Sequence, residues 1–162
     1  MTSRLLASIA LAAALLVGTT GCTFSAEIAT EKEYDPSDGV GIEVGELAIR
    51  NALLIGDDAE NLNLVMTVVS SADTDRRLTV QWQSGGERVS EEVFVTAGGS
   101  TIFGGPDQAQ LLVVDSGATI GGLVPLYFSY TGAEGRELLV PVLDGSLPEY
   151  EIFVPPATPA AD

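Results

Sequence analysis

The clearest chemical motif in the sequence surrounds its single cysteine, near the start of the chain. Cys22 follows the small residues Thr19-Thr20-Gly21, and the apolar run 5–17 lies before them, after Arg4. A positive charge, a short apolar segment and small residues ending in cysteine form a lipobox. The sequence therefore predicts a lipoprotein signal peptide, with cleavage between Gly21 and Cys22 and acyl chains such as palmitate on Cys22. The expected location is the extracytoplasmic face of the cell membrane.

Two other interpretations of this segment are weaker. The apolar run is too short for a permanent transmembrane helix, which needs ~20 residues to cross a ~30 Å hydrocarbon core. An ordinary secretory signal with an incidental cysteine is the other alternative, since Thr19 stands where leucine is usual. The lipobox interpretation accounts for both the small residues and the cysteine.

The rest of the chain offers little catalytic chemistry. It contains no histidine, which removes the commonest general base, the Ser-His-Asp triad and most transition-metal sites. No nucleophile elbow, P-loop or dinucleotide-binding motif is present. We predict a protein that is not an enzyme and that carries no cofactor.

Carboxylates and one thioether are the remaining candidate ligands. The acidic clusters 57–60 and 73–75 fall in predicted turns, where solvated turn caps are the expected role. A calcium site and a glycosidase-like carboxylate pair stay open as alternatives. After cleavage, Met66 is the only methionine and hence the one candidate for a soft metal ligand, but no metal site is predicted.

The charge of the chain restricts its partners. The formal net charge is -16 at pH 7, so the surface repels the phosphates of nucleic acids and anionic lipid headgroups. We therefore predict no nucleic acid partner, and a membrane contact made through the lipid on Cys22 rather than through a basic patch.

Composition divides the chain into four parts. Residues 1–21 are the predicted signal peptide, and 22–41 combine the lipidated cysteine with a flexible tether. Residues 42–154 form the predicted β domain, and 155–162 a disordered Pro/Ala tail.

The predicted domain consists of short β segments separated by turn signals. The expected strands are 46–55, 61–70, 77–83, 88–96, 100–103, 110–114, 123–130, 137–143 and 149–154. Eight or nine strands at this spacing predict an immunoglobulin-like β-sandwich, with a closed barrel as the alternative. No amphipathic helix is expected after the signal peptide.

Alternation predicts which side chains face the core. One face should carry Leu62, Leu64, Met66 and Val68, another Leu78, Val80 and Trp82, and a third Leu47, Ile49, Leu53 and Ile55 with Asn51 as an interruption. Trp82 is thus expected to pack in the core rather than to stack on a ligand.

Aromatic residues and prolines near the C-terminus give further expectations. Tyr127 and Phe128 should lie on opposite faces, one in the core and one exposed, and the same is expected of Tyr150 and Phe153. Exposed aromatics there would mark a partner surface. Pro125 and Pro141 cannot donate to a ladder, so their hairpin is expected at a sheet edge.

Two stretches carry family resemblances. The segments 34–40, YDPSDGV, and 44–55, VGELAIRNALLI, resemble the LpqE-type lipoproteins of actinobacteria. That resemblance implies an envelope protein without an established catalytic activity.

More distantly, 122–130, GLVPLYFSY, followed by 140–142, VPV, resembles the final hairpin of the PCu(A)C copper chaperones. This resemblance implies an immunoglobulin-like or cupredoxin-like sandwich. The family's His and Met copper ligands are missing: Gln110-Leu111-Leu112 and Val80-Gln81-Trp82 stand in the corresponding places.

The sequence therefore favours a non-catalytic envelope lipoprotein that acts as an accessory or interaction module, with an unidentified protein partner. The alternative is a copper-chaperone-like protein that handles metal through an altered or lost site.

Overall fold

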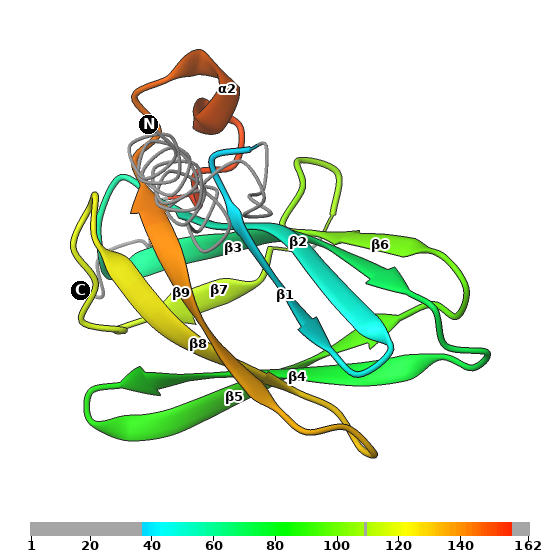
Figure 1. Cartoon of the computed structure of the whole chain (residues 1–162). Helices are drawn as coiled ribbons and strands as arrows, with labels where there is room; N and C mark the ends of the chain where they lie inside the picture. Colours follow the sequence, from blue (N-terminus) through cyan, green and yellow to red (C-terminus); the bar gives the residue numbers. More distant parts are fainter. Residues whose placement is uncertain (1–36, 109, 157–162) are drawn as a thin grey trace, which may run out of the picture. The chain divides into compact units, whose positions relative to one another are not determined.

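The computed structural model describes residues 37–108 and 110–156 (Figure 1). The predicted signal peptide, Gly21, Cys22, most of the tether and tail residues 157–162 lie outside the described residues. Among the residues that are described, no helix reaches the length and apolar character that crossing a membrane requires.

Nine strands and one short helix form the described fold. They are β1 (Val40–Val44), β2 (Leu47–Ile55), β3 (Asn61–Ser70), β4 (Arg76–Ser84), β5 (Glu87–Val95), β6 (Ser100–Phe103), β7 (Leu112–Val114), β8 (Leu123–Ser129), β9 (Arg136–Leu143) and α2 (Pro148–Glu151). Every predicted strand from 46 to 143 overlaps an observed one. β1 was not predicted, and it begins before the expected domain start at residue 42.

The strands form one sheet that curls into two facing halves. Its order is β5-β4-β8-β9-β2-β3-β6, with β1 also paired to β2 and β7 to β3. Most neighbours are antiparallel, but β2 and β9 join the two halves through a short parallel pairing of Leu54 with Val142 and Ile55 with Leu143. Figure 1 shows β4 and β5 facing the half that contains β2 and β3. The predicted all-β sandwich is confirmed.

The core lies between the two halves, and strand alternation fills it as predicted. The fully buried side chains from β3, β4 and β8 include Leu62, Leu64, Val68, Leu78, Val80, Leu126 and Phe128. Trp82 is only 4% exposed, and its Nε1–H donates a hydrogen bond to the Val114 carbonyl at 3.1 Å. The expected core position of Trp82 is confirmed.

The alternation in β2 breaks at Asn51, which has a φ of 50°. The pairing with β3 shifts register between Arg50 and Leu53, so a bulge puts Ala52 and Leu54 in the core after Leu47 and Ile49. The expected single face that continues through Leu53 and Ile55 is therefore wrong in register, although both side chains are buried.

The expected strand 149–154 is wrong. Pro148 starts the short helix α2 instead, since its fixed φ suits the first helical turn and its missing N–H is not needed there. Tyr150 and Phe153 are both half-buried, so the expected division into one core and one exposed ring fails. The Tyr150 hydroxyl donates to the Asp38 carboxylate, and the Phe153 carbonyl accepts from Asn63 Nδ2 at 2.9 Å.

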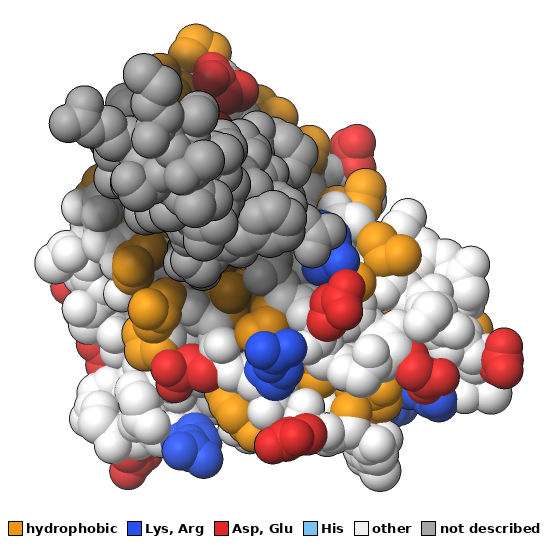
Figure 2. Space-filling model, viewed as in Figure 1, with side chains coloured by type: hydrophobic (Ala, Val, Ile, Leu, Met, Phe, Trp, Pro, Cys, Tyr) orange, Lys and Arg blue, Asp and Glu red, His pale blue; other side chains and the backbone are white. Residues whose placement is uncertain are grey.

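Charged side chains are mixed on the visible surface. Figure 2 shows acidic and basic side chains interspersed with apolar ones on one face of the molecule. Arg50 and Glu43 form an exposed ion pair at 3.0 Å. Such exposed pairs add little to folding stability.

Candidate functional site

A groove opens on the outer face of the sheet where β4 and β8 separate. Their pairing runs from Thr79 with Ser129 to Gln81 with Tyr127 and ends there. The next outward residue of β8 is Pro125, which has no N–H to continue a ladder. The hollow beside it has a volume of about 360 Å³.

The position of this hairpin corrects a sequence expectation. β8 and β9 are in the middle of the strand order, so the predicted edge position is wrong. Each proline instead lies at a position where its strand pairs with only one neighbouring strand. Pro125 of β8 pairs with Leu139 of β9, and Pro141 of β9 pairs with Leu123 of β8. The local requirement of proline is met without an edge strand.

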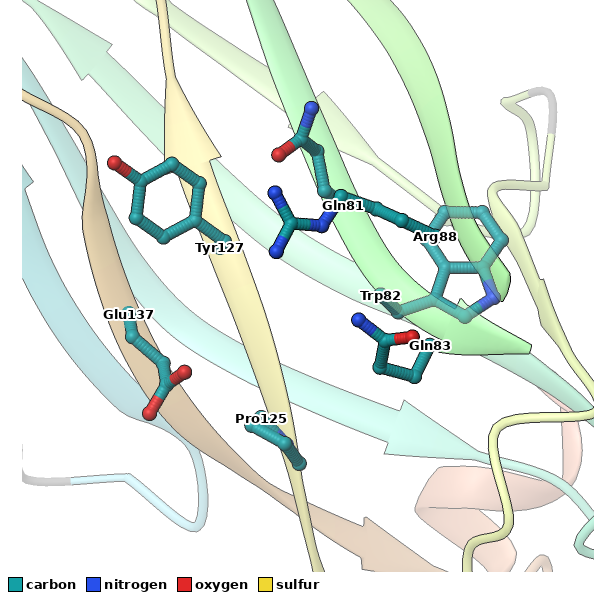
Figure 3. A pocket seen from close by; sticks show the side chains of 7 residues that line it. All are labelled: Gln81, Trp82, Gln83, Arg88, Pro125, Tyr127 and Glu137. Carbon is teal, nitrogen blue, oxygen red and sulfur yellow. The ribbon is translucent and has the colours of Figure 1, made fainter. Parts of the chain in front are cut away.

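Four strands supply the lining of the groove, which we name the β4–β8 groove. Its residues are Gln81, Trp82, Gln83, Arg88, Pro125, Tyr127 and Glu137. Figure 3 shows the Arg88 side chain reaching from β5 across β4 toward the ring of Tyr127, with Glu137 on the other side of β8. Trp82 turns its indole to the core, so the other six side chains define the accessible surface.

The strand register explains why these polar groups meet. Gln81 pairs with Tyr127, and Tyr127 pairs with Glu137, so the three side chains form one row across β4, β8 and β9. In the next row, Gln83 pairs directly with Arg88. Directly paired residues lie on the same face, so both rows point outward.

Tyr127 is the exposed aromatic of this face. Its side chain is 39% exposed, whereas Phe128 is fully buried, which confirms the predicted division between these two rings. The Tyr127 ring lies against Gly135, where a Cβ would come within 2.5 Å of Oη and 2.6 Å of Cε1. Glycine at residue 135 therefore gives the ring the space to lie in this orientation.

Arg88 and Glu137 lack ion pairs within the described part of the chain. The other described arginines each contact an acceptor: Arg50 with Glu43, Arg76 with Glu46, Arg77 with Glu92, and Arg136 with the Glu43 carbonyl. Arg88 and Glu137 keep their charges available to a molecule in the groove. Because the two charges are opposite, they cancel within it.

A second tyrosine at the end of β8 shows the opposite situation. The Tyr130 cluster consists of Tyr130, Glu46 and Arg76: the Tyr130 hydroxyl accepts from the Glu46 N–H at 2.9 Å, and Arg76 lies 5.7 Å from the ring centroid. Arg76 also pairs with Glu46 at 2.8 Å, and this hydrogen bond raises the pKa of the guanidinium. These contacts join the three residues, so the cluster fastens β8 to the β1–β2 turn.

The chemistry of the β4–β8 groove suits recognition. The glutamine amides can donate and accept, the guanidinium donates, the carboxylate accepts, and Tyr127 offers an aromatic face with a hydroxyl. Of the seven lining side chains, none is a serine, threonine, cysteine, lysine or histidine. Such a surface binds polar molecules that also present an apolar face.

Among the residues predicted as sites or aligned with the copper ligands, Gln81 and Trp82 line the groove, whereas Cys22 and Gly21 are outside the described residues. Met66 lies in β3 opposite Phe103 and is 1% exposed, so its thioether is inside the core. In the other copper-aligned segment, Leu111 is buried while Gln110 and Leu112 are exposed.

The acidic clusters cap turns, as predicted. Asp58 Oδ1 accepts from the N–H groups of Glu60 and Asn61 at 3.1 and 2.8 Å, and Asp75 Oδ1 accepts from Ala97 at 2.9 Å. Within residues 37–108 and 110–156, no three carboxylate, thiol or imidazole side chains gather in a way that could hold a metal ion.

The sequence singles out Tyr127 as an exposed ring and Pro125 as a ladder breaker, but these two expectations do not by themselves predict the groove. The signal was their spacing: both have the same parity on β8, so the ladder breaker and the ring share one face. Arg88 follows the Gly85-Gly86 turn and pairs with Gln83 in the β4–β5 hairpin. Its approach to Tyr127 depends on the pairing of β4 with β8, two strands that are distant in sequence, and that pairing has no local sequence signal.

Comparison with known proteins identifies a shared fold. No family model matches the chain, and no curated protein sequence matches it. The solved copper-bound PCuAC domain from PmoF2 matches with a TM-score of 0.51 and 19% identity, covering 64% of this chain and 97% of that domain. The apo form of the PmoF2 domain gives 0.51 and 18% over 66% and 97%. At these identities the similarity establishes the fold, a PCuAC-like β-sandwich, and not the function.

Proposed function

We propose that this chain is a lipid-anchored, non-catalytic module of the cell envelope that recognises another envelope component through the β4–β8 groove. Its lipid would be attached to Cys22, on the outer face of the cytoplasmic membrane, as in the LpqE-type lipoproteins that the sequence resembles. The observation that carries the recognition role is a pair of charges, Arg88 and Glu137, that form no ion pair with any described residue and lie beside the exposed ring of Tyr127.

The side chains of the groove contribute little to folding stability. A charge left without an ion pair on a strand contributes little to folding, and a large exposed aromatic leaves apolar surface in water. The Tyr130 cluster demonstrates that the same residue types in this chain can be paired and covered. Side chains that add little to stability, yet converge on a hollow, favour a role in binding.

The anchor is tested by metabolic labelling of the full-length protein with a clickable palmitate analogue, followed by membrane fractionation. The wild type should incorporate the label and sediment with membranes, whereas Cys22→Ala should not be labelled. Thr19→Leu, which introduces the residue usual at that position, should retain labelling. An unlabelled wild type, or Cys22→Ala that is labelled and retained in the membrane pellet, would contradict the proposal.

Copper handling is the second candidate, favoured by one observation, the fold shared with a PCuAC domain that binds copper. The burial of Met66 weighs against it, because coordination there would require the core to open. A competition titration of the full-length protein with a chromophoric Cu(I) chelator decides between the two. We expect no binding at micromolar copper; stoichiometric binding tighter than about 1 μM, about -8 kcal/mol, would favour copper handling.

A further inference from the structure

The β4–β8 groove has a composition that selects among ligand classes. It combines one exposed aromatic ring with two amides, one guanidinium and one carboxylate. The amides and the two charged groups are planar and hydrogen-bond in their own planes, around a ring that offers its face. A ligand that fits must have an apolar face and many hydroxyl groups along its edge.

The charges of the groove and of the whole protein further restrict the class of ligand. Arg88 and Glu137 cancel, so the groove itself favours neither an anion nor a cation, and the formal charge of -16 repels anions from the protein as a whole. A neutral ligand is not repelled electrostatically by the groove or by the rest of the protein. Its hydroxyls can accept from Arg88 and donate to Glu137. Charge-assisted hydrogen bonds of this kind are stronger than neutral ones.

The size and openness of the site fit a chain rather than an enclosed small molecule. The volume of about 360 Å³ is near the lower end of ligand pockets, about 300 to 1,000 Å³. The groove lies on a sheet face, bordered by the exposed residues Pro125 and Leu139 of β8 and β9. An oligomer can therefore enter and leave along the surface with one or two units in the hollow.

We propose that the β4–β8 groove binds an uncharged oligosaccharide, with one pyranose ring stacked on Tyr127 and its hydroxyls hydrogen-bonded by Gln81, Gln83, Arg88 and Glu137. This inference rests on the proposed function, because a module on the outer face of the membrane meets envelope glycans. The Tyr127 ring provides the stacking surface, and the polar side chains fix the orientation of the sugar.

Gly135 has a positioning role in this site. An alanine there would push its Cβ against the Tyr127 hydroxyl and ring edge, so the ring must turn away from its present orientation. The aromatic side chain would still be present, but its face would no longer border the hollow in the same way. Gly135→Ala therefore tests the orientation of the Tyr127 ring, whereas Tyr127→Ala tests its presence.

The test uses the full-length protein in nanodiscs without glycolipids, and avoids sugar-based detergents. The probes are neutral di- to hexasaccharides of glucose, mannose, galactose and N-acetylglucosamine, followed by saturation-transfer NMR and calorimetry. At least one series should bind. Tyr127→Ala should weaken binding about tenfold, equivalent to about 1.4 kcal/mol, and Gly135→Ala should also weaken it.

Phe94→Ala is the matched control. Phe94 is 56% exposed on β5 and pairs with Arg77, which places it on the same outer face but outside the groove. Its loss should leave sugar binding unchanged. Arg88→Met and Glu137→Ala should each weaken binding by severalfold, because each removes a charge-assisted hydrogen bond.

Three outcomes would overturn the inference: no neutral oligosaccharide binds; binding persists unchanged in Tyr127→Ala; or the groove binds zwitterionic peptides and no sugar. These outcomes are distinct from failure of the anchor, which the palmitate labelling of Cys22 reports whether or not a sugar binds.

Discussion

Two tyrosines three residues apart on the same part of the chain have opposite surroundings. Tyr130 is 9% exposed, its hydroxyl accepts from the Glu46 N–H, and Arg76 lies over its ring while paired to Glu46. Tyr127 is 39% exposed and has Arg88 and Glu137 nearby without ion pairs in the described residues. The same residue types serve packing at one place and leave a binding surface at the other.

Strand parity produces this difference. Tyr127 is in the outward row of β8, whereas Tyr130 follows the end of the strand and turns to the β1–β2 hairpin. A ring that points outward can be covered only by long side chains from neighbouring strands. In the β4–β8 groove, Arg88 approaches the ring but the separation of β4 from Pro125 leaves the hollow open.

The largest expected difference is in the alanine variants. Tyr130→Ala should lower the free energy of unfolding by about 3 kcal/mol, since it removes a nearly buried ring and its hydrogen bond. Tyr127→Ala should change it by less than about 0.5 kcal/mol. Urea unfolding of the full-length protein, followed by fluorescence of the single tryptophan Trp82, measures both. Equal losses would remove the distinction between the two sites.

Phenylalanine variants isolate the hydroxyl groups. Tyr130→Phe should cost about 1 kcal/mol, because the partly buried Glu46 N–H loses its acceptor while the ring stays in place. Tyr127→Phe should leave stability unchanged. The same unfolding measurement applies, and a cost for Tyr127→Phe as large as that for Tyr130→Phe would indicate a structural role for the Tyr127 hydroxyl.

Substitution of the two arginines should also affect stability unequally, with the larger loss at the Tyr130 cluster, but the difference should be smaller than for the tyrosines. Arg76→Met should lower the midpoint of thermal unfolding, since Arg76 donates to Glu46 and Thr74 and stacks on Tyr130. Arg88→Met should not lower it. High salt should reduce the effect of Arg76→Met, because ions screen an exposed pair. A lower midpoint in Arg88→Met would show that Arg88 contributes to the fold.

The smallest expected effect on stability is that of a third tyrosine, Tyr150, and it appears only at high pH. The hydrogen bond to Asp38 raises the pKa of Tyr150 to about 12 from its ordinary value of 10.0. Because the folded-state pKa is the higher one, the stabilising contribution is complete below pH ~10 and disappears as pH rises through about 12. Ultraviolet titration of phenolate absorbance should show a late component that Tyr150→Phe lacks; an unchanged titration curve in that variant would exclude the shift.

The strands and the core could be predicted because they depend on local alternation. Leu62, Leu64 and Met66 repeat with the period of a strand, and each is buried as expected. The same alternation predicts the core position of Trp82, which is 4% exposed. A two-residue period needs no knowledge of which strands become neighbours.

Features that depend on partners or on special backbone angles were missed. The bulge at Asn51 needs a left-handed residue, and asparagine is only one of several types that permit it. The α2 turn replaces the expected strand because Pro148 starts a helical turn, and Asn63 and Asp38 bind that segment through side chains. The groove likewise arises from the meeting of four strands, which the order of residues along the chain does not specify.

Amide chemical-shift mapping of the full-length protein in nanodiscs, titrated with the neutral oligosaccharide that binds best, shows whether the sugar binds in the β4–β8 groove. Binding in this groove should shift the amide signals of Gln81, Gln83, Arg88, Tyr127 and Glu137 and leave those of Glu46, Arg76 and Tyr130 unaffected. Shifts that centre on the Tyr130 cluster, or the absence of shifts with every oligosaccharide, would contradict it.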